Sequence, residues 1–221
     1  MKKLDYVFLA CYIAFFAAVG WLVYLGMFDI WNREAPYIAG FFQFVVFATS
    51  GELLSTRILE KKWQINKYIV YKAFVWGVGG LIVTLAFNVI SGGIGGAMEN
   101  GLLPFANSRF ARALFTSCFL NLFFAPIHAA VMRIFSNYGE ERIFNRRRMT
   151  AKESIASVEW GEFIDFTYFK TAPTFWIPVN TLGFLLPQTL QVAFAAMLSF
   201  AFGMLMTVLK IRERKIQKGV A

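Results

Sequence analysis

The chain of 221 residues is hydrophobic and basic: 58% of its residues are hydrophobic, 18% are aromatic, and the formal net charge is +9. Together with a mean hydropathy of +0.55, this composition excludes an ordinary soluble domain and predicts an integral membrane protein. The pI near 9.7 is compatible with nucleic-acid binding, but the basic residues flank apolar runs, so we expect a bilayer partner and no nucleic acid.

We expect an all-α fold, a polytopic transmembrane helical bundle that forms one domain over residues 1–221, with about six membrane segments. The first apolar run, Leu4 to Met27, is long enough for one crossing at about 1.5 Å per residue. It is too long for the apolar part of a signal peptide and lacks a cleavage site of small residues. Residues 1–35 are therefore interpreted as an additional N-terminal span, and residues 36–210 as the main helical core.

Further apolar runs follow a short loop over residues 29–36; they cover residues 37–59, 68–90 and 109–138. The run over 68–90 carries Gly77, Gly79 and Gly80 near its middle, and such small residues let membrane helices approach closely. Residues 91–108 are rich in glycine and asparagine, which predicts a loop. Its glycines lack the spacing of a phosphate-binding motif.

Polar side chains share one face of the run over residues 109–138. Asn121 follows Ser117 by four residues and His128 follows Asn121 by seven, so all three project in the same direction. Asn121 serves equally as a hydrogen-bonding contact between helices or as the wall of a pore. For His128, a hydrogen-bonded contact between helices is favoured over a role as a pH sensor. Pro126 is expected to kink this helix.

Residues 139–170 are expected to form a basic loop followed by an amphipathic helix at the membrane interface. The candidate lipid contacts are Arg146, Arg147, Arg148 and Lys152. A cluster of this kind favours anionic lipids, although an ordinary solvated loop is an equal alternative. Residues 211–221 form a second basic segment, a tail.

Residues 171–210 contain no charge between Lys170 and Lys210, and Pro178 and Pro187 interrupt them. This pattern predicts a helical hairpin with its break at Pro187, since proline removes a backbone donor and clashes with the preceding turn. The first arm is short. A total of five crossings with one re-entrant segment is therefore an alternative to six crossings.

Basic residues are distributed asymmetrically along the chain. With six spans, all but Arg33, Arg109 and Arg112 of the 22 Lys and Arg residues fall on one side. The positive-inside rule then places both termini on the cytoplasmic or equivalent side of a bacterial cytoplasmic membrane or an organelle membrane.

Glu52 is the most informative single residue because it is a carboxylate late in an apolar run. Thr49 and Thr56 lie three and four residues away, so one helix face presents hydroxyl groups around the carboxylate. Intramembrane charges are costly and usually face a water path, which indicates a cation site or a proton-linked gate. The alternative is a structural carboxylate paired with a nearby Arg57 or Lys61.

No arrangement of residues suggests an enzyme. The sequence shows no paired carboxylates, no Ser-His-Asp set and no cluster of metal ligands where water could react, and His128 is its only histidine. We therefore expect no catalytic residues, no metal and no cofactor.

Four segments in order resemble a known family. They are SGELLSTRILEKK, the glycine-rich run over residues 68–90, NLFFAPIHAAVMRIF and FWIPVNTLGFLLPQTLQV. Together these segments resemble the Gly-Asp-x-x-x-Gln, Phe-Ala-Pro, Trp-Pro and Val-Pro motifs of the family of Mpv-seventeen and the twenty-two-kilodalton peroxisomal membrane protein. The resemblance covers roughly residues 36–210.

The resemblance implies a small membrane protein of mitochondrial inner-membrane or peroxisomal type, proposed to form a weakly selective pore for ions and small metabolites. Here Glu52 stands where the family has aspartate and Gln191 where it has arginine, and the span over 1–35 is additional. A distant bacterial member is consistent with these departures. We therefore expect a channel with Glu52, Asn121, His128 and Asn180 along its path. The alternative is a non-conducting scaffold that binds anionic lipid or a partner protein; a homo-oligomer is compatible with either.

Overall fold

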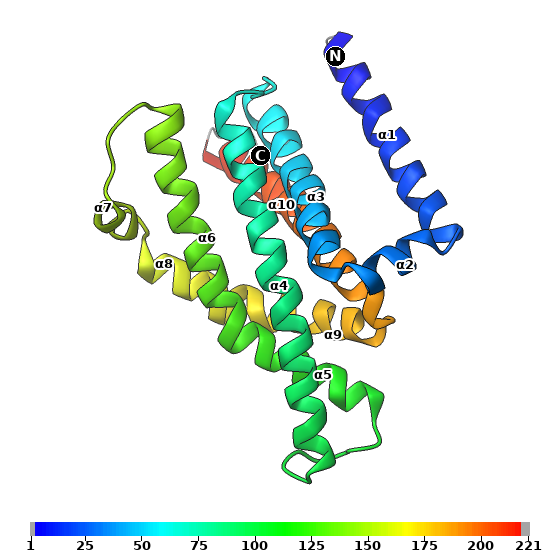
Figure 1. Cartoon of the computed structure of the whole chain (residues 1–221). Helices are drawn as coiled ribbons and strands as arrows, with labels where there is room; N and C mark the ends of the chain where they lie inside the picture. The colour runs from blue at the N-terminus through cyan, green and yellow to red at the C-terminus, as the bar shows by residue number, and fades with distance from the viewer. Residues whose placement is uncertain (1–2, 218–221) are drawn as a thin grey trace.

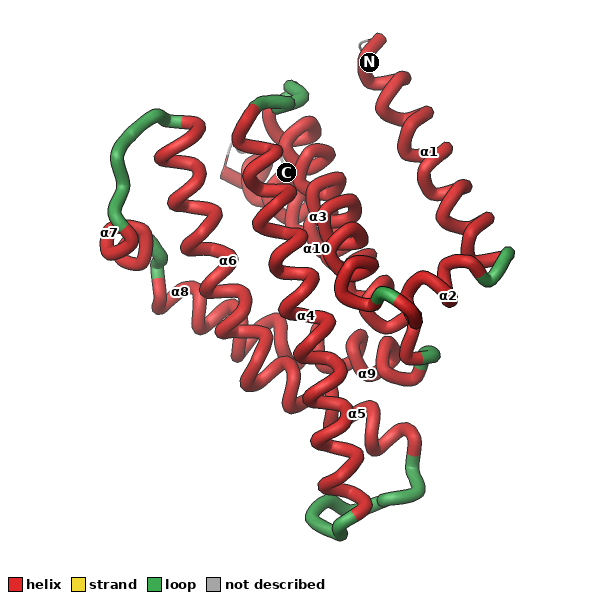
Figure 2. Tube along the Cα trace, viewed as in Figure 1, coloured by secondary structure: helices red, strands yellow, loops and turns green. Residues whose placement is uncertain are grey.

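The computed structural model describes residues 3–217, with the surroundings of side chains given from residue 5 to residue 212. The described part of the chain consists of helices joined by loops and contains no strand, which confirms the all-α class (Figure 1, Figure 2). The elements are α1 (Lys3–Tyr24), α2 (Met27–Glu34), α3 (Pro36–Glu60), α4 (Lys67–Glu99), α5 (Arg109–Phe119), η1 (Leu120–Phe124), α6 (Ala125–Gly139), η2 (Glu140–Phe144), α7 (Ala151–Ala156), α8 (Trp160–Ile164), η3 (Asp165–Trp176), α9 (Ile177–Leu185) and α10 (Gln188–Gln217), where η denotes a π-helical segment.

Five helical stretches in the described part are long and apolar enough to cross a membrane. They are Asp5–Tyr24, Pro36–Glu60, Lys67–Glu99, Arg109–Phe144 and Gln188–Arg212. Residues 171–186, expected as a sixth segment, instead form the end of a helical run that starts at Trp160 and includes η3 and α9. Five crossings with an additional partial segment, the alternative count above, matches these lengths.

Helices α3 and α4 pack closely through glycine. A Cβ atom built on Gly80 would lie 2.4 Å from the carbonyl oxygen of Gly40 and 2.9 Å from Cβ of Phe44, and one on Gly77 would lie 2.5 Å from the ring of Phe41. Contacts this short require the absence of a side chain. The predicted role of these glycines in close helix packing is thus confirmed.

Helix α10 completes the core. The buried cluster is formed by Phe44 and Phe47 of α3, Val83 and Phe87 of α4, Leu120 of η1, and Val192 and Ala196 of α10. Helix α10 also approaches α3 at Gly51, where an added Cβ would lie 3.1 Å from Cα of Phe200. The hydroxyl of Thr207, which is buried, donates to Ser55 at 2.6 Å. In Figure 1 these helices lie side by side at the centre of the molecule.

Two expected loops are partly helical. Residues 100–108 form a loop as expected, and the expectation is wrong for residues 91–99 and 29–34. Residues 91–99 continue α4, because Met98 is buried and the backbone at Gly95 receives the side chain of Arg112. Residues 27–34 form α2, which buries Phe28 and Asn32 and follows a turn at Gly26 with φ of +71°. Within residues 91–99, Gly95 is closely packed, whereas an added Cβ at Gly92, Gly93 or Gly96 would meet no atom within 4 Å.

The segment expected as one amphipathic helix is divided. Helix α7 ends at Ala156, residues 157–159 separate it from α8, and π-helical η3 follows directly. The single interfacial helix expected within residues 139–170 is therefore wrong in detail. The expected tail over residues 211–221 lies partly outside the described residues, beyond residue 217.

Proline accompanies two π-helical segments and one helix break in the second half of the chain. The N–H of Ala125 donates five residues back to Leu120, directly before Pro126, and the N–H of Ile177 donates five residues back to Ala172, directly before Pro178. Since proline has no N–H, the preceding residue closes a wider turn in both places. Pro187 lies between α9 and α10, which confirms the predicted break of the hairpin.

Candidate solute pocket

A polar pocket of about 490 Å³ opens where α4, α5, α9 and α10 meet. Its walls are formed by Asn88, Ser91 and Gly92 of α4, Arg109, Arg112, Ala113 and Thr116 of α5, Phe184 and Leu185 of α9, and Gln188 and Gln191 of α10. The volume lies within the ~300–1,000 Å³ typical of small-molecule sites. The turn at Pro187 brings α9 and the first residues of α10 to this pocket.

Two arginines give the pocket its charge. Arg112 lies over Gly95 of α4, where an added Cβ would be 2.0 Å from Nη2, and Arg109 donates from Nη2 to the carbonyl oxygen of Leu185 at 3.4 Å. Both arginines are exposed, and neither forms an ion pair with any side chain among residues 5–212. No acidic residue lines the pocket. Guanidinium groups in such a setting suit a carboxylate, a phosphate or another small anion.

Amide side chains complete the walls. Gln188 donates from Nε2 to Oδ1 of Asn88 at 2.8 Å, which joins the start of α10 to α4. Gln191 donates from Nε2 to the carbonyl oxygen of Leu186 at 3.1 Å. The bond from Gln191 uses a backbone carbonyl group that the helix break at Pro187 leaves without a helical partner.

A buried hydrogen-bond network continues from the base of the pocket between α5 and α9. Thr116, which lines the pocket, precedes Ser117, whose hydroxyl donates to the carbonyl oxygen of Ile177 at 2.8 Å. Asn121 donates from Nδ2 to the Ser117 carbonyl oxygen at 2.8 Å, and Asn180 donates to Oδ1 of Asn121 at 3.2 Å. All four side chains are buried. The structure thus brings Asn121 and Asn180 together, although they are 59 residues apart.

His128 does not join that network. Its ring stacks on Phe124 with centroids 5.4 Å apart and an interplanar angle of 21°. Its Nε2 lies at Gly79, where an added Cβ would be 3.3 Å away. The residue therefore lies between α6 and α4 as expected, but its Nε2 is buried without a hydrogen-bond partner among the described residues.

Glu52 is paired with a residue that sequence spacing did not indicate. Its Oε1 forms an ion pair with Nζ of Lys72 on α4, and Trp76 donates from Nε1 to Oε2 at 3.3 Å. The side chain of Lys72 is 14% exposed and that of Glu52 is 26% exposed. Since the lysine compensates the carboxylate, this arrangement matches the structural alternative more closely than a free cation site, with Lys72 in place of Arg57 or Lys61.

The two threonines near Glu52 point to different surroundings. Thr56 donates to the carbonyl oxygen of Glu52 at 2.9 Å within α3. The hydroxyl of Thr49 is buried and has no hydrogen-bond partner among the described residues. Neither threonine hydroxyl therefore hydrogen-bonds to the Glu52 carboxylate in the described part of the chain.

The basic loop after η2 is exposed on the surface. Arg146, Arg148 and Lys152 are exposed, and Arg147, also exposed, lies 3.6 Å from the carboxylate of Glu141. Arg146 has a φ of +54°. These side chains are available to a charged partner, as the expected role in lipid contact requires.

Arg109 and Arg112 were placed only on the outer side of the membrane by charge counting, and no binding role was expected for them. The signal that could have identified them is the absence of any acidic residue between Glu99 and Glu140. Two arginines in such a segment have no local partner. Their convergence with Gln188 and Gln191 depends on how four helices pack, which sequence spacing does not show.

No protein-family model, no curated protein and no solved structure matches the chain. The resemblance to the family of Mpv-seventeen therefore stays a prediction. The functional argument rests on the pocket and the helices around it.

Proposed function

We propose that the protein is an integral membrane helical bundle that admits small anionic solutes through the pocket at Arg109 and Arg112. The observation that carries the proposal is the pairing of two arginines without acidic partners with amide and hydroxyl side chains in one pocket between four helices. Apolar helices long enough to cross a bilayer support the membrane location. The proposed pathway is a weakly selective pore, as expected from the sequence. It prefers anions, whereas the sequence indicated a cation site at Glu52.

Charge placement supports the preference for anions. The expected cation site at Glu52 is compensated by Lys72. The pocket, in contrast, carries positive charge only, and hydrogen bonds between charged groups contribute about 1.5–3 kcal/mol each. A small carboxylate, a phosphate or a halide would therefore be concentrated at the pocket, whereas a cation would be repelled.

The arrangement of chain ends supports an orientation. The N-terminal end of α1, the connection between α3 and α4, and the basic loop before α7 lie toward one end of the molecule, and the connection between α4 and α5 lies at the opposite end (Figure 1). Under the positive-inside rule the first end is cytoplasmic or equivalent. The arginine pocket, near the start of α5, would then face the other side and receive solute from there.

The network of Ser117, Asn121 and Asn180 is the place where such a pathway would be opened and closed. It joins α5 and η1 to α9, and each of these regions contains a π-helical turn before a proline. Irregular helices inside membrane proteins are tolerated where they are covered by protein or line a cavity. We infer that separation of α9 from α5 admits solute from the pocket into the bundle.

Flux measurements in proteoliposomes test the proposal. The purified protein is reconstituted, and chloride and acetate efflux are measured beside potassium efflux. We expect anion efflux above that of protein-free vesicles. The variant Arg109→Gln/Arg112→Gln should lower it about tenfold or more, the factor corresponding to the loss of one charge-assisted contact.

The variant Arg33→Gln is the matched control, because Arg33 is exposed and lies outside the pocket, in an ion pair with Asp29. It should leave efflux unchanged. Equal anion and potassium efflux, or equal losses in the pocket and control variants, would contradict the role of the arginines. A reconstituted protein without any efflux would favour the non-conducting scaffold, for which the exposed cations of residues 146–152 are the contact surface.

A further inference from the structure

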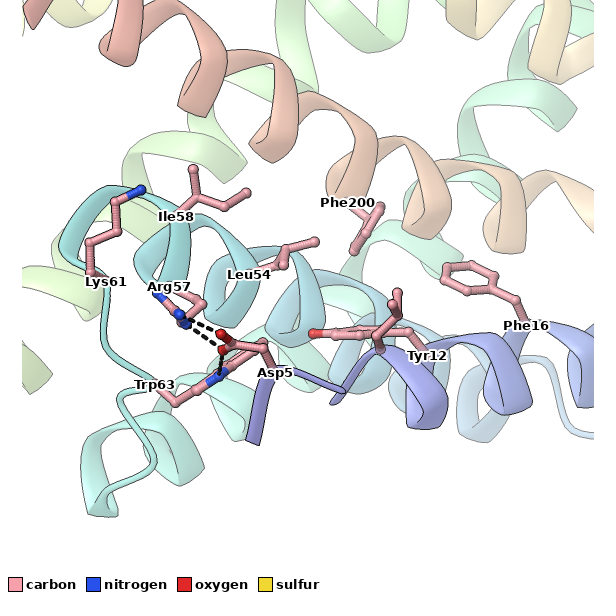
Figure 3. A pocket seen from close by; sticks show the side chains of 10 residues that line it. Asp5, Tyr12, Phe16, Leu54, Arg57, Ile58, Lys61, Trp63 and Phe200 are labelled. Carbon is pink, nitrogen blue, oxygen red and sulfur yellow. Dashed lines mark hydrogen bonds and ion pairs between the residues drawn. The ribbon is translucent and has the colours of Figure 1, made fainter. Parts of the chain in front are cut away.

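A second cavity, of about 350 Å³, separates α1 from α3 and α10 (Figure 3). Its lining residues are Asp5, Leu9, Tyr12, Phe16, Leu54, Arg57, Ile58, Lys61, Trp63 and Phe200. The charged residues lie at one end of the cavity, and apolar and aromatic side chains form its remaining walls (Figure 3). The volume is at the lower end of the ~300–1,000 Å³ typical of small-molecule sites.

Helix α1 is held beside this cavity by few contacts. At one end Asp5 accepts two hydrogen bonds from Arg57, at 2.6 Å and 2.7 Å, and a third from Nε1 of Trp63 at 2.9 Å. Farther along, the hydroxyl of Tyr12 donates to the carbonyl oxygen of Ser50 at 3.0 Å. None of the apolar window of α1 is buried within the protein. Most apolar side chains of α1 are exposed, whereas Phe8 and Phe15 are partly covered by Trp63 and Phe47.

The space between the helices is apolar. The apolar lining comes from Leu9 and Phe16 of α1, Leu54 and Ile58 of α3, and Phe200 of α10. Figure 3 shows Phe16, Leu54 and Phe200 along this part of the cavity. The ring of Phe16 lies 6.0 Å from that of Phe200, centroid to centroid. An unfilled space of this size lined by apolar side chains loses dispersion contacts, so an apolar occupant is favoured.

The charged end of the cavity indicates the charge of the group that would bind there. Asp5 compensates Arg57, whereas Lys61 forms no ion pair with any side chain among residues 5–212. Lys61 is exposed and ends α3 with a φ of +62°, and Lys62, also exposed, follows it. The cavity therefore combines a narrow apolar body with an uncompensated ammonium group at one end.

We propose that this cavity holds one acyl chain of an anionic phospholipid whose phosphate contacts Lys61. The chain occupies the space between α1 and the α3 and α10 pair, and the headgroup lies at the end where Arg57 and Lys61 emerge, which the positive-inside rule assigns to the cytoplasmic side. The inference rests on the membrane location proposed above but not on the passage of anions. It gives α1 a role as one wall of a lipid site.

Photolabelling of the full chain in nanodiscs tests the proposal. The probes are phosphatidylglycerol and phosphatidylcholine that each carry a diazirine in one acyl chain, and mass spectrometry locates the adducts. We expect phosphatidylglycerol to label the peptides around Leu9, Leu54 and Phe200 in preference to phosphatidylcholine. The variant Lys61→Gln should lower that preference about fivefold, the contribution of one lysine near a membrane surface.

Two variants complete the experiment. Lys62→Gln removes the same charge from the adjacent residue, which does not line the cavity, and should change the preference less than Lys61→Gln does. Leu54→Trp fills the cavity and should reduce labelling of the peptide around Leu9 by both probes.

Equal labelling by the two probes, or equal effects of the two lysine variants, would overturn the anionic headgroup. Labelling around Leu9 that persists at full strength in Leu54→Trp would overturn the cavity as the site of the acyl chain. Anion efflux in the same preparation reports on the proposed function separately.

Discussion

Helix α1 and the core of α3, α4 and α10 are made of similar residues, yet they are held by different forces. Both regions contain helices apolar enough to cross a membrane. In the core, Gly40 and Gly80 bring backbones into contact and the phenylalanine cluster fills the space between helices. Helix α1 instead contacts the bundle through Asp5, Tyr12 and a few aromatic rings. Apolar composition alone thus does not determine which helices form the core.

In a membrane, where we propose that the protein lies, the difference follows from the environment of the helices. When lipid tails are as apolar as the side chains, burial by itself drives no association, and close packing or polar contacts must supply it. The core uses close packing over the length of its helices. Helix α1 uses polar contacts near one end, which leaves room for the cavity along its side. Three predictions separate these two modes of attachment, and a fourth concerns α7, outside both regions.

The largest effect is expected from Gly80→Val. The new side chain would meet the carbonyl oxygen of Gly40, a backbone atom that cannot move aside alone, so α3 and α4 must separate. We expect a loss of roughly 3 kcal/mol of stability, at the upper end for overpacking. Thermal unfolding in detergent measures it. Gly93→Ala, on the same helix with no atom within 4 Å, should leave the melting temperature unchanged or raise it slightly.

A smaller and more local effect is expected from Asp5→Asn. The amide cannot replace the paired hydrogen bonds to Arg57, so α1 should detach while the core stays intact, at a cost of about 2 kcal/mol for a charged hydrogen-bonded pair. Hydrogen exchange should become faster in α1 and stay unchanged in α4. Glu60→Gln is the control, since Glu60 bonds only locally to Gln64 among the hydrogen bonds found. Equal exchange changes in both helices would mean that α1 belongs to the core unit.

The ion pair of Glu52 and Lys72 combines the two modes of attachment. It is a polar contact, as in the attachment of α1, but it joins two core helices, α3 and α4. Glu52→Gln should lower stability by about 1 kcal/mol, and the double variant Glu52→Gln/Lys72→Gln should be no less stable than the single one, since it removes the lysine left without its partner. Thermal unfolding of the wild type, the two single variants Glu52→Gln and Lys72→Gln, and the double variant forms the cycle. Anion efflux should not respond to Glu52→Gln, and a change in ion preference would restore the role in selectivity expected from the sequence.

The smallest effect concerns the edge of the molecule. Hydrogen bonds to Glu153 from the backbone N–H of Thr150, and then from its hydroxyl, hold the pKa of Glu153 below its ordinary value of 4.5. Because this pKa is depressed in the folded protein, the contribution to α7 is present above pH 4.5 and is lost as the pH falls through the folded pKa. Carbon NMR of the carboxyl group measures the midpoint. Thr150→Ala should raise the pKa of Glu153 part of the way toward its ordinary value, because the backbone hydrogen bond remains. Thr174→Ala on η3 should leave this pKa unchanged.

The helices and their order could be predicted from the sequence because apolar runs of sufficient length have few alternatives. Runs around Phe44, Val83 and Val192 became helices, and Pro187 separated α9 from α10. The length of α4 could not be predicted. Gly92, Gly93 and Gly96 resemble loop residues, but Met98 buries against the rest of the bundle and extends the helix.

The candidate site was harder to predict. Asn121 and Asn180 were identified as polar residues in apolar runs, but their hydrogen bond depends on how α5 and α9 meet. The partner of Glu52 was missed because Lys72, 20 positions farther along, becomes a neighbour only when α3 and α4 fold back antiparallel. Arg112 was read as a marker of membrane side, and its place over Gly95 requires the packed structure.

Because α10 is part of the core, the core can be completed only late in the synthesis of the chain. Phe44 and Phe47 are made early, but they share their cluster with Val192 and Ala196, about 150 positions later in the chain. At a synthesis rate of ~5–20 residues per second, the first helices wait roughly ten seconds or more for that partner. During this interval the glycine contact of α3 and α4 can form, whereas the surface that receives α10 stays open to lipid or to an insertion factor. A ribosome stalled before residue 188 would therefore expose this surface, and crosslinks from Phe47 to its surroundings would report the moment when α10 arrives.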